Sequence, residues 1–350
     1  PASGAFSSAQ IDFAQPLDQA LDLRWQPRFR VQLDAGGQVI KPIVFYLDRG
    51  TPEPVRQALL DGAGWWAEAF EQAGFPKGFR VELMPEGVDP MDIRYNIITW
   101  THRDVRGWSY GNAIVDPRTG EIIKGAVNLG SQRVRQDILI AEALLAPYDK
   151  PNSSALVEQA QQMALARLRQ LSAHEVGHTL GFAHNFAASR TGGGSVMDYP
   201  FPTIELDGNG APKLANAYGV GVSDWDVFLV RHGYGIYGDE DAALAKLRAQ
   251  IRAEGYQYVS DPDARAPGDA HPAGVLWDLS GSDPLAGFDK LMRARSYALA
   301  HFSRGVLPPS RQLGQFEARL VPVYLLHRYQ TDAVARLLGG ASYRYGLASD

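Results

Sequence analysis

Apolar residues follow two different periods in the first part of the chain. Residues 43–50 form a run of β-branched and aromatic residues that ends in a turn signal, which predicts a strand. Residues 51–75 repeat their apolar residues at helical spacing, so we expect a helix that ends at Gly74. Those apolar positions are Val55, Leu59, Ala63, Trp66 and Phe70. Gly62 and Gly64 interrupt the helix, which indicates that another element packs closely against its middle.

Strand patterns continue beyond this helix. Residues 79–85 and 92–100 each predict a strand. Residues 112–130 predict a hairpin, because Asp116, Pro117 and Gly120 supply a turn in its middle. The order of strand, helix, strand, strand and hairpin indicates a mixed sheet with a helix on one face.

Helical patterns dominate the second half of the chain. A long one runs from about Ser154 to Leu180. After Pro200 the strand signals mostly vanish, and helices are expected to begin after Ser223 and Asp283, two favourable N-cap residues. This part of the chain is therefore expected to be helical.

Length and composition limit the interpretation further. The 350 residues could hold one large domain or two, and their 45% hydrophobic content is enough for a substantial core. We expect an N-terminal arm at 1–38, a main domain at 39–235 and a mainly helical extension at 236–350. The net charge of −5 argues against a nucleic-acid partner or an anionic membrane surface. No apolar run is long enough to predict a membrane span, and any signal peptide is expected to have been removed or never present.

The absence of cysteine excludes disulfides, thiol nucleophiles and Cys-bound zinc. Any metal must therefore be held by histidine, carboxylate, tyrosine or water.

The stretch "HEVGHTLGFAH" at 174–184 is the strongest chemical signal. His174 and His178 stand four apart on the predicted helix, so both imidazoles can reach one zinc ion, with Glu175 beside it. Gly181 can adopt positive φ, end the helix and return His184 towards the same metal.

Two other interpretations of this stretch were weighed. A helix with surface or core histidines explains neither Gly181 nor Glu175. A purely structural zinc normally takes four protein ligands, whereas three leave the open position of a catalytic site.

A methionine turn follows the histidine motif. "SVMDYP" places Met197 thirteen residues after His184, and together the two motifs resemble the metzincin clan of zinc metallopeptidases. The nearest resemblance is to the bacterial EcxA-like metzincins, and it extends from about Ile43 to Tyr345. It is carried by "GWSYGNAIVDPRTGEIIKGAVNLGS", "HEVGHTLGFAHNF", "SVMDYP" and "VPVYLLHRYQ".

The resemblance implies an α+β fold. In this fold a metzincin-type catalytic domain, with a mixed twisted sheet, an active-site helix and a Met-turn, precedes a helical C-terminal region. It implies that Met197 forms an apolar floor below the histidines, a role close to that of any core methionine. Tyr199 would be a movable extra zinc ligand and a donor to the transition state, or else a packed tyrosine. Asn185 departs from the residue that follows the third histidine in astacins, serralysins, adamalysins and matrixins.

Peptide hydrolysis is the reaction that the resemblance implies. Zinc on the three histidines would lower the pKa of a water molecule, and Glu175 would take its proton and pass it to the leaving amine. An extended substrate would lie along an edge strand. The second arm of the hairpin is the candidate for this strand, although a plain structural hairpin is an equal alternative. Its residues are Lys124, Gly125, Ala126, Val127 and Asn128.

Other functions and ligands stay open. The chain could instead be a metal-binding, toxin-like or binding subunit without peptidase activity, or a zinc hydrolase that acts on another bond. Calcium at 207–210 or 260–264 is weakly indicated, because ordinary turns explain both stretches better. Secretion or a place in the bacterial periplasm or cell envelope follows from the resemblance alone.

Overall fold

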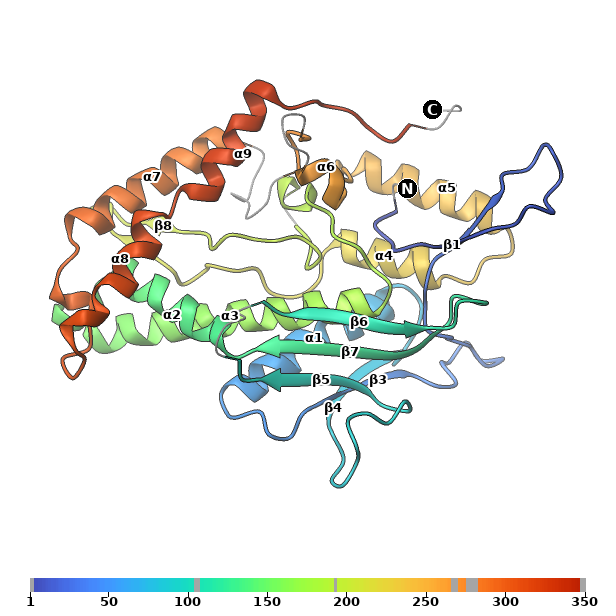
Figure 1. Ribbon diagram of the computed structural model, residues 1–350, viewed down its shortest axis with the longest axis horizontal. Coiled ribbons are helices and arrows are strands. Elements are labelled where there is room, and N and C mark those ends of the chain that lie inside the picture. Colours follow the sequence, from blue (N-terminus) through green and yellow to red (C-terminus); the bar gives the residue numbers. More distant parts are fainter. Residues whose placement is uncertain (1–2, 104–107, 192–193, 266–269, 275–282, 347–350) are drawn as a thin grey trace.

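The computed structural model describes residues 3–103, 108–191, 194–265, 270–274 and 283–346. A five-stranded mixed sheet forms one layer of the fold (Figure 1). Its order is β4 (Phe79–Leu83), β3 (Ile43–Leu47), β5 (Asn96–Thr101), β7 (Ile122–Gly130) and β6 (Tyr110–Val115). The first four strands run parallel, and β6 pairs antiparallel with β7 at one edge. The predicted α+β class and mixed sheet are therefore confirmed.

Two helices pack together on the sheet. They are α1 (Val55–Gln72) and α3 (Ser153–Thr179), and α3 follows the long helix expected from the sequence within one residue at each end. At their crossing a Cβ on Gly62 would lie 1.9 Å from the carbonyl oxygen of Arg169, so only glycine allows this approach. The close packing predicted at Gly62 is confirmed, whereas a Cβ on Gly64 would meet nothing within 4 Å.

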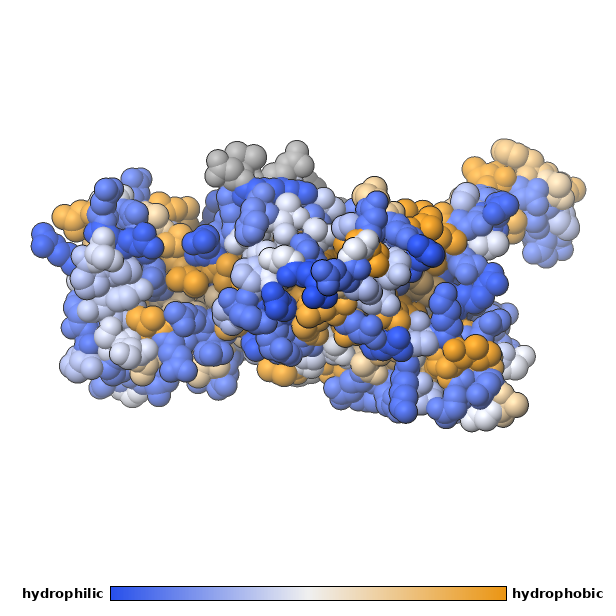
Figure 2. Space-filling model, turned by 90° about the horizontal axis from the view of Figure 1, so that it is seen from below, coloured by the Kyte–Doolittle hydropathy of each residue, from blue (hydrophilic) through white to orange (hydrophobic). Residues whose placement is uncertain are grey.

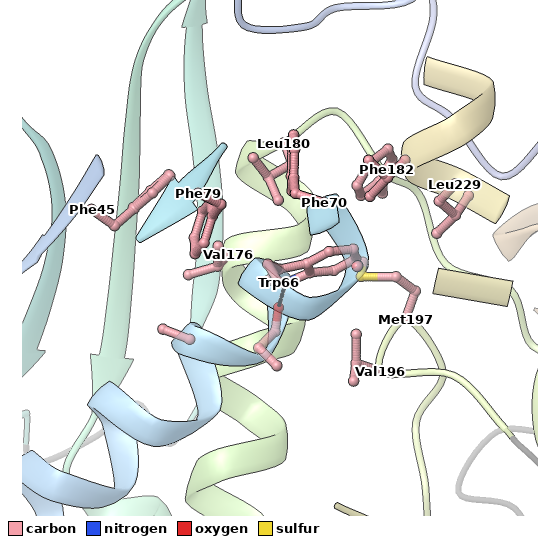
Figure 3. Close-up of a cluster of buried hydrophobic side chains, with 14 of the residues drawn as sticks. Phe45, Trp66, Phe70, Phe79, Val176, Leu180, Phe182, Val196, Met197 and Leu229 are labelled. Carbon is pink, nitrogen blue, oxygen red and sulfur yellow. Dashed lines mark hydrogen bonds between the residues drawn. The ribbon is translucent and has the colours of Figure 1, made fainter. Parts of the chain in front are cut away.

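The largest core lies between this helix pair and the sheet. Figure 3 shows Trp66 and Phe70 of α1 beside Val176 and Leu180 of the α3 end, with the sulfur of Met197 next to the Trp66 ring. The indole N–H of Trp66 donates to the carbonyl oxygen of Ala173 over 2.7 Å, which fixes α1 against the part of α3 that carries the histidines.

The N-terminal arm is more ordered than the sequence indicated. Strands β1 (Ser8–Ile11) and β2 (Asp22–Trp25) form an antiparallel hairpin. Its connecting loop projects from the molecule and gathers exposed apolar side chains, at the right of Figure 2. Before the hairpin, Ala5 forms a β-bridge with Phe182, so the arm also contacts the turn that follows α3.

The remainder of the chain is mainly helical, as expected after Pro200. The other helices are α2 (Gln132–Leu145), α4 (Asp224–Tyr234), α5 (Glu240–Ala253), α6 (Asp261–Arg265), α7 (Pro284–Ala300), α8 (Glu317–Tyr324) and α9 (Arg328–Gly339). Short 3-10 turns occupy Pro147–Asp149, Ala188–Arg190, Arg304–Val306 and Leu313–Gln315, and β8 (Glu205–Leu206) and β9 (Pro212–Lys213) form a two-stranded ribbon. Helices α7, α8 and α9 lie at the end of the molecule opposite the β1–β2 hairpin (Figure 1).

The main core extends across both predicted domain boundaries. It includes Phe29 from the N-terminal arm and Tyr256 from the C-terminal extension. The proposed division at 38/39 and 235/236 stays a prediction. Within the described part of the chain, no helix combines the length and apolar character that a membrane span requires.

Candidate metal centre

The last turns of α3 place three chemical groups together. His174 and His178 are one helical turn apart and leave the same face, and Glu175 lies beside them in a buried position. The helix ends at Thr179, and Gly181 follows with φ of +96°. A Cβ on Gly181 would also lie 2.1 Å from the carbonyl oxygen of Pro27. Both the turn and the N-terminal arm therefore require glycine here, as the sequence indicated for the turn.

The turn at Gly181 returns His184 to the other two histidines. The Nε2 atom of His178 lies 3.1 Å from the Nε2 atoms of both His174 and His184, and the last pair is 3.2 Å apart. Among the described residues, these are the three side chains whose potential ligand atoms converge on one point.

Each of these rings has an acceptor at its other nitrogen. Nδ1 of His174 donates to the carbonyl oxygen of Val196 over 2.6 Å, and Nδ1 of His178 donates to that of Phe182 over 2.8 Å. Nδ1 of His184 faces a carboxylate oxygen of Asp261 at 2.7 Å. These acceptors favour a proton on Nδ1 in all three rings, so the Nε2 lone pairs face one another as they would around a bound cation.

Burial keeps His174 and His178 in the neutral form that binds metal. It lowers the pKa of His174 well below the usual value, and the neighbouring His178 and His184 lower it further. Burial and His184 lower the pKa of His178 to about 4. Neutral imidazoles without any thiolate form a donor set that suits zinc, so these residues fit the ion that the motif implies.

Glu175 is held between α3 and the edge strand β6. The backbone N–H of Gly111 donates to its carboxylate, and burial raises its pKa to about 8 against the opposing effects of Arg167 and this hydrogen bond. A Cβ on Gly111 would lie 2.0 Å from the carbonyl oxygen of Glu175, so β6 reaches the helix only with glycine there. A cation between the histidines would favour the ionised form of Glu175.

Met197 lies directly beneath the ligand helix. Its side chain is fully buried, and a Cβ on Gly177 would lie 2.3 Å from its sulfur. The turn is held by the Ser195 hydroxyl, which accepts from the Met197 N–H and donates to Asp226 at the start of α4. Met197 therefore contacts the ligand helix between His174 and His178, and its role as an apolar floor stays a prediction.

Tyr199 stands beside two of the ligand rings. Its ring centroid lies 5.0 Å from that of His174 and 4.6 Å from that of His184. The geometry brings Tyr199 to the centre, and its role as a ligand or a donor stays a prediction.

The second arm of the hairpin was expected to be an edge strand, and this expectation is wrong. Strand β7 lies between β5 and β6, so the backbone of Lys124, Gly125, Ala126, Val127 and Asn128 is already paired within the sheet. Lys124 is itself buried and donates to the carbonyl oxygens of Pro90 and Asp92. Among the described strands, β6, the first arm of the hairpin, forms the edge of the sheet next to β7. Its alternating exposure fits an edge strand, whereas the nearly continuous apolar run of β7 fits an interior one.

The two stretches considered for calcium lie in the β8–β9 turn and at the start of α6. The Asp207 carboxylate accepts from the N–H groups of Asn209 and Ala211 in the β8–β9 turn. In the other stretch, Ser260 donates to Asp263 while Asp261 contacts His184. The calcium prediction is not tested by this geometry.

Sequence reasoning missed two contributors to the centre. Asp261 lies 77 positions from His184, and no spacing rule joins them. Asn185, a departure from known families in the sequence, is fully buried and bonds to residues 257 and 259. A polar residue directly after a predicted ligand was the available signal.

A family model described as Met-zincin matches residues 157–350, more than half of the chain. No curated protein and no solved structure matches the chain. The matched part contains all three histidines, Glu175 and the methionine turn. The chain therefore belongs to the Met-zincin family.

Proposed function

We propose that this protein is a zinc-dependent metalloendopeptidase. The observation that carries the proposal is the convergence of the Nε2 atoms of His174, His178 and His184, with Glu175 on the same helix. Resemblance further supports a bacterial enzyme of the EcxA-like type, secreted or located in the cell envelope.

The three histidines would hold the zinc ion through Nε2. When bound, zinc supplies a Lewis acid that lowers the pKa of a water molecule and polarises a carbonyl group. Glu175 takes the proton of the attacking water and passes it to the leaving amine. The Gly111 N–H holds the carboxylate of Glu175 in place for both transfers. Tyr199, next to two of the histidine rings, would donate a hydrogen bond to the developing oxyanion.

The substrate would lie along β6 in place of the originally expected β7. Within the described part of the chain, strand β6 pairs with β7 on one side only, and its Gly111 touches the helix that carries Glu175. An extended peptide can add to this edge through backbone hydrogen bonds and so bring its carbonyl group to the centre.

Cleavage of casein by the zinc-loaded chain tests the proposal. We expect cleavage that a chelator abolishes and added zinc restores. A peptide library derived from a proteome would then give the preferred residues around the cleaved bond, with Glu175→Ala as the inactive control. Zinc binding without cleavage of any protein or peptide would contradict the proposal and favour a metal-binding subunit without peptidase activity.

A further inference from the structure

A short segment of the C-terminal extension lies directly against the third histidine. Residues 257–261 run beside residues 184–186 and are joined to them by hydrogen bonds. We call residues 257–261 the clamp segment. It lies outside the zinc motif and outside the expected catalytic domain.

The Asn185 side chain makes two hydrogen bonds to the clamp segment. Its side-chain NH2 donates to the carbonyl oxygen of Gln257 over 2.8 Å, and its side-chain oxygen accepts from the N–H of Val259 over 3.1 Å. Its backbone N–H donates to the carbonyl oxygen of Met197 over 3.0 Å. Aspartate or glutamate at this position could not donate to Gln257, and would leave its carbonyl oxygen unsatisfied. Asparagine therefore suits position 185, which joins the loop of the third histidine, the methionine turn and the clamp segment.

The neighbouring residue extends the same contact. The N–H of Phe186 donates to the carbonyl oxygen of Val259 over 3.0 Å. Both side chains are buried in a small apolar cluster that also contains Ala264 of α6 and has Tyr199 packed against it. The clamp segment is thus packed against the centre by apolar contacts and by hydrogen bonds.

Asp261, the last residue of the clamp segment, contacts the metal-ligand candidate His184 directly. Its carboxylate oxygen lies 2.7 Å from Nδ1 of His184, whose side chain is only 13% exposed. A carboxylate in this position fixes the proton on Nδ1, directs Nε2 towards the metal and makes the imidazole a stronger donor. The other two histidines have only neutral carbonyl acceptors, so Asp261 is the one anionic partner among these three contacts.

We propose that the clamp segment is part of the metal centre, with Asp261 as the positioning residue of His184. Because the segment is joined to the third ligand, zinc binding and packing of the segment stabilise each other. The inference rests on the zinc site of the proposed function but does not depend on peptide cleavage.

Zinc affinity tests the role of Asp261. We expect Asp261→Ala to weaken zinc binding by about 10- to 100-fold in competition with a chromophoric chelator. Asp261→Asn, which keeps the shape and an acceptor oxygen, should lie between this variant and the parent protein. Asp241→Ala is the matched control, because Asp241 is an exposed aspartate of α5 that lies outside the clamp segment. We also expect the visible spectrum of the cobalt-substituted protein to shift in Asp261→Ala and not in the control.

Hydrogen exchange tests the link between zinc and the clamp segment. Zinc should slow exchange of the Phe186 and Val259 amides in the parent protein, and less so in Asp261→Ala. Unchanged zinc affinity and an unchanged cobalt spectrum in Asp261→Ala would overturn the positioning role. If Asp261→Ala does not fold, the zinc affinity and the cobalt spectrum of Asp261→Asn test the positioning role instead. Zinc protection of Phe186 without protection of Val259 would overturn the linkage, whereas a parent protein that binds no zinc would contradict the proposed function itself.

Discussion

Gly177 and Met197 approach each other so closely that a single added carbon atom would collide with the sulfur. A Cβ on Gly177 would lie 2.3 Å from Sδ of Met197 and 2.7 Å from Cζ2 of Trp66. Gly177 lies between the two histidines of α3. Because glycine has no side chain, Met197 can contact the backbone of the ligand helix at this position. The methionine turn and the ligand helix therefore depend on each other for their positions.

Gly177→Ala should displace the methionine turn or the helix. We expect it to lower the free energy of unfolding by about 1–3 kcal/mol, because both neighbours of the new methyl group are fully buried. Urea unfolding of the metal-free protein measures this change. Gly64→Ala is a matched control within α1, since a Cβ there meets nothing within 4 Å. The control should instead stabilise the helix by roughly 0.5–1 kcal/mol, and equal destabilisation by both variants would contradict the proposed contact.

Glu175→Gln should separate metal binding from proton transfer. The amide keeps the size of the side chain but cannot accept a proton, so we expect kcat/KM for peptide cleavage to fall by about 10²- to 10⁴-fold. Zinc affinity should change only a few-fold, because Glu175 is not one of the three converging ligands. Glu158→Gln on the same helix should leave both quantities unchanged. Full-rate cleavage by zinc-loaded Glu175→Gln would remove Glu175 from the mechanism.

Asp198 should make stability depend on pH in the metal-free protein. Burial raises the pKa of this carboxyl from 3.8 to about 6, despite its hydrogen bonds from Ser189 and Tyr199. Between these two values the folded state binds a proton that the unfolded state has released. The free energy of unfolding should therefore fall as pH rises from about 4 to 6, by at most about 3 kcal/mol.

Asp198→Asn tests that contribution, because the amide does not titrate. Urea unfolding at several pH values should show a smaller decline between pH 4 and 6 in the variant than in the parent protein. An identical slope in the two proteins would assign the pH dependence to other groups. The comparison concerns slopes only, since the amide also changes the hydrogen bonds to Ser189 and Tyr199.

Local patterns predicted the parts of the centre that depend on local geometry. The spacing of His174 and His178 follows from the helical repeat, and the return of His184 follows from the positive φ that glycine allows. Strand order is different, because it depends on which distant segments pair. The hairpin at 112–130 was expected, but no local pattern within it indicates that β5 pairs with the other side of β7. The contact of Asp261 with His184 is similarly non-local, since it depends on how the C-terminal extension packs.

The free edge of β6 has a defined set of outward-facing groups. On β6, the Gly111 N–H donates to Glu175. On β7, the N–H of Gly125 donates to Asn96, on the side of β7 that faces away from β6, and Gly125 is the residue that pairs with Ala113. Residues 111 and 113 therefore occupy non-hydrogen-bonded pairs with β7, and the N–H and C=O groups of Ala113 face away from the sheet.

Ala113→Pro should consequently weaken substrate binding with little damage to the sheet. Proline removes the outward N–H of an edge strand, a position where it is tolerated, and the loss of one hydrogen bond raises KM by roughly 2- to 13-fold. Zinc affinity should not change. Asn112→Pro is the matched control, because the N–H of Asn112 faces β7 by the same alternation, so this variant should lower stability instead. A KM for Ala113→Pro equal to that of the parent enzyme would show that the peptide does not add to β6 at this residue.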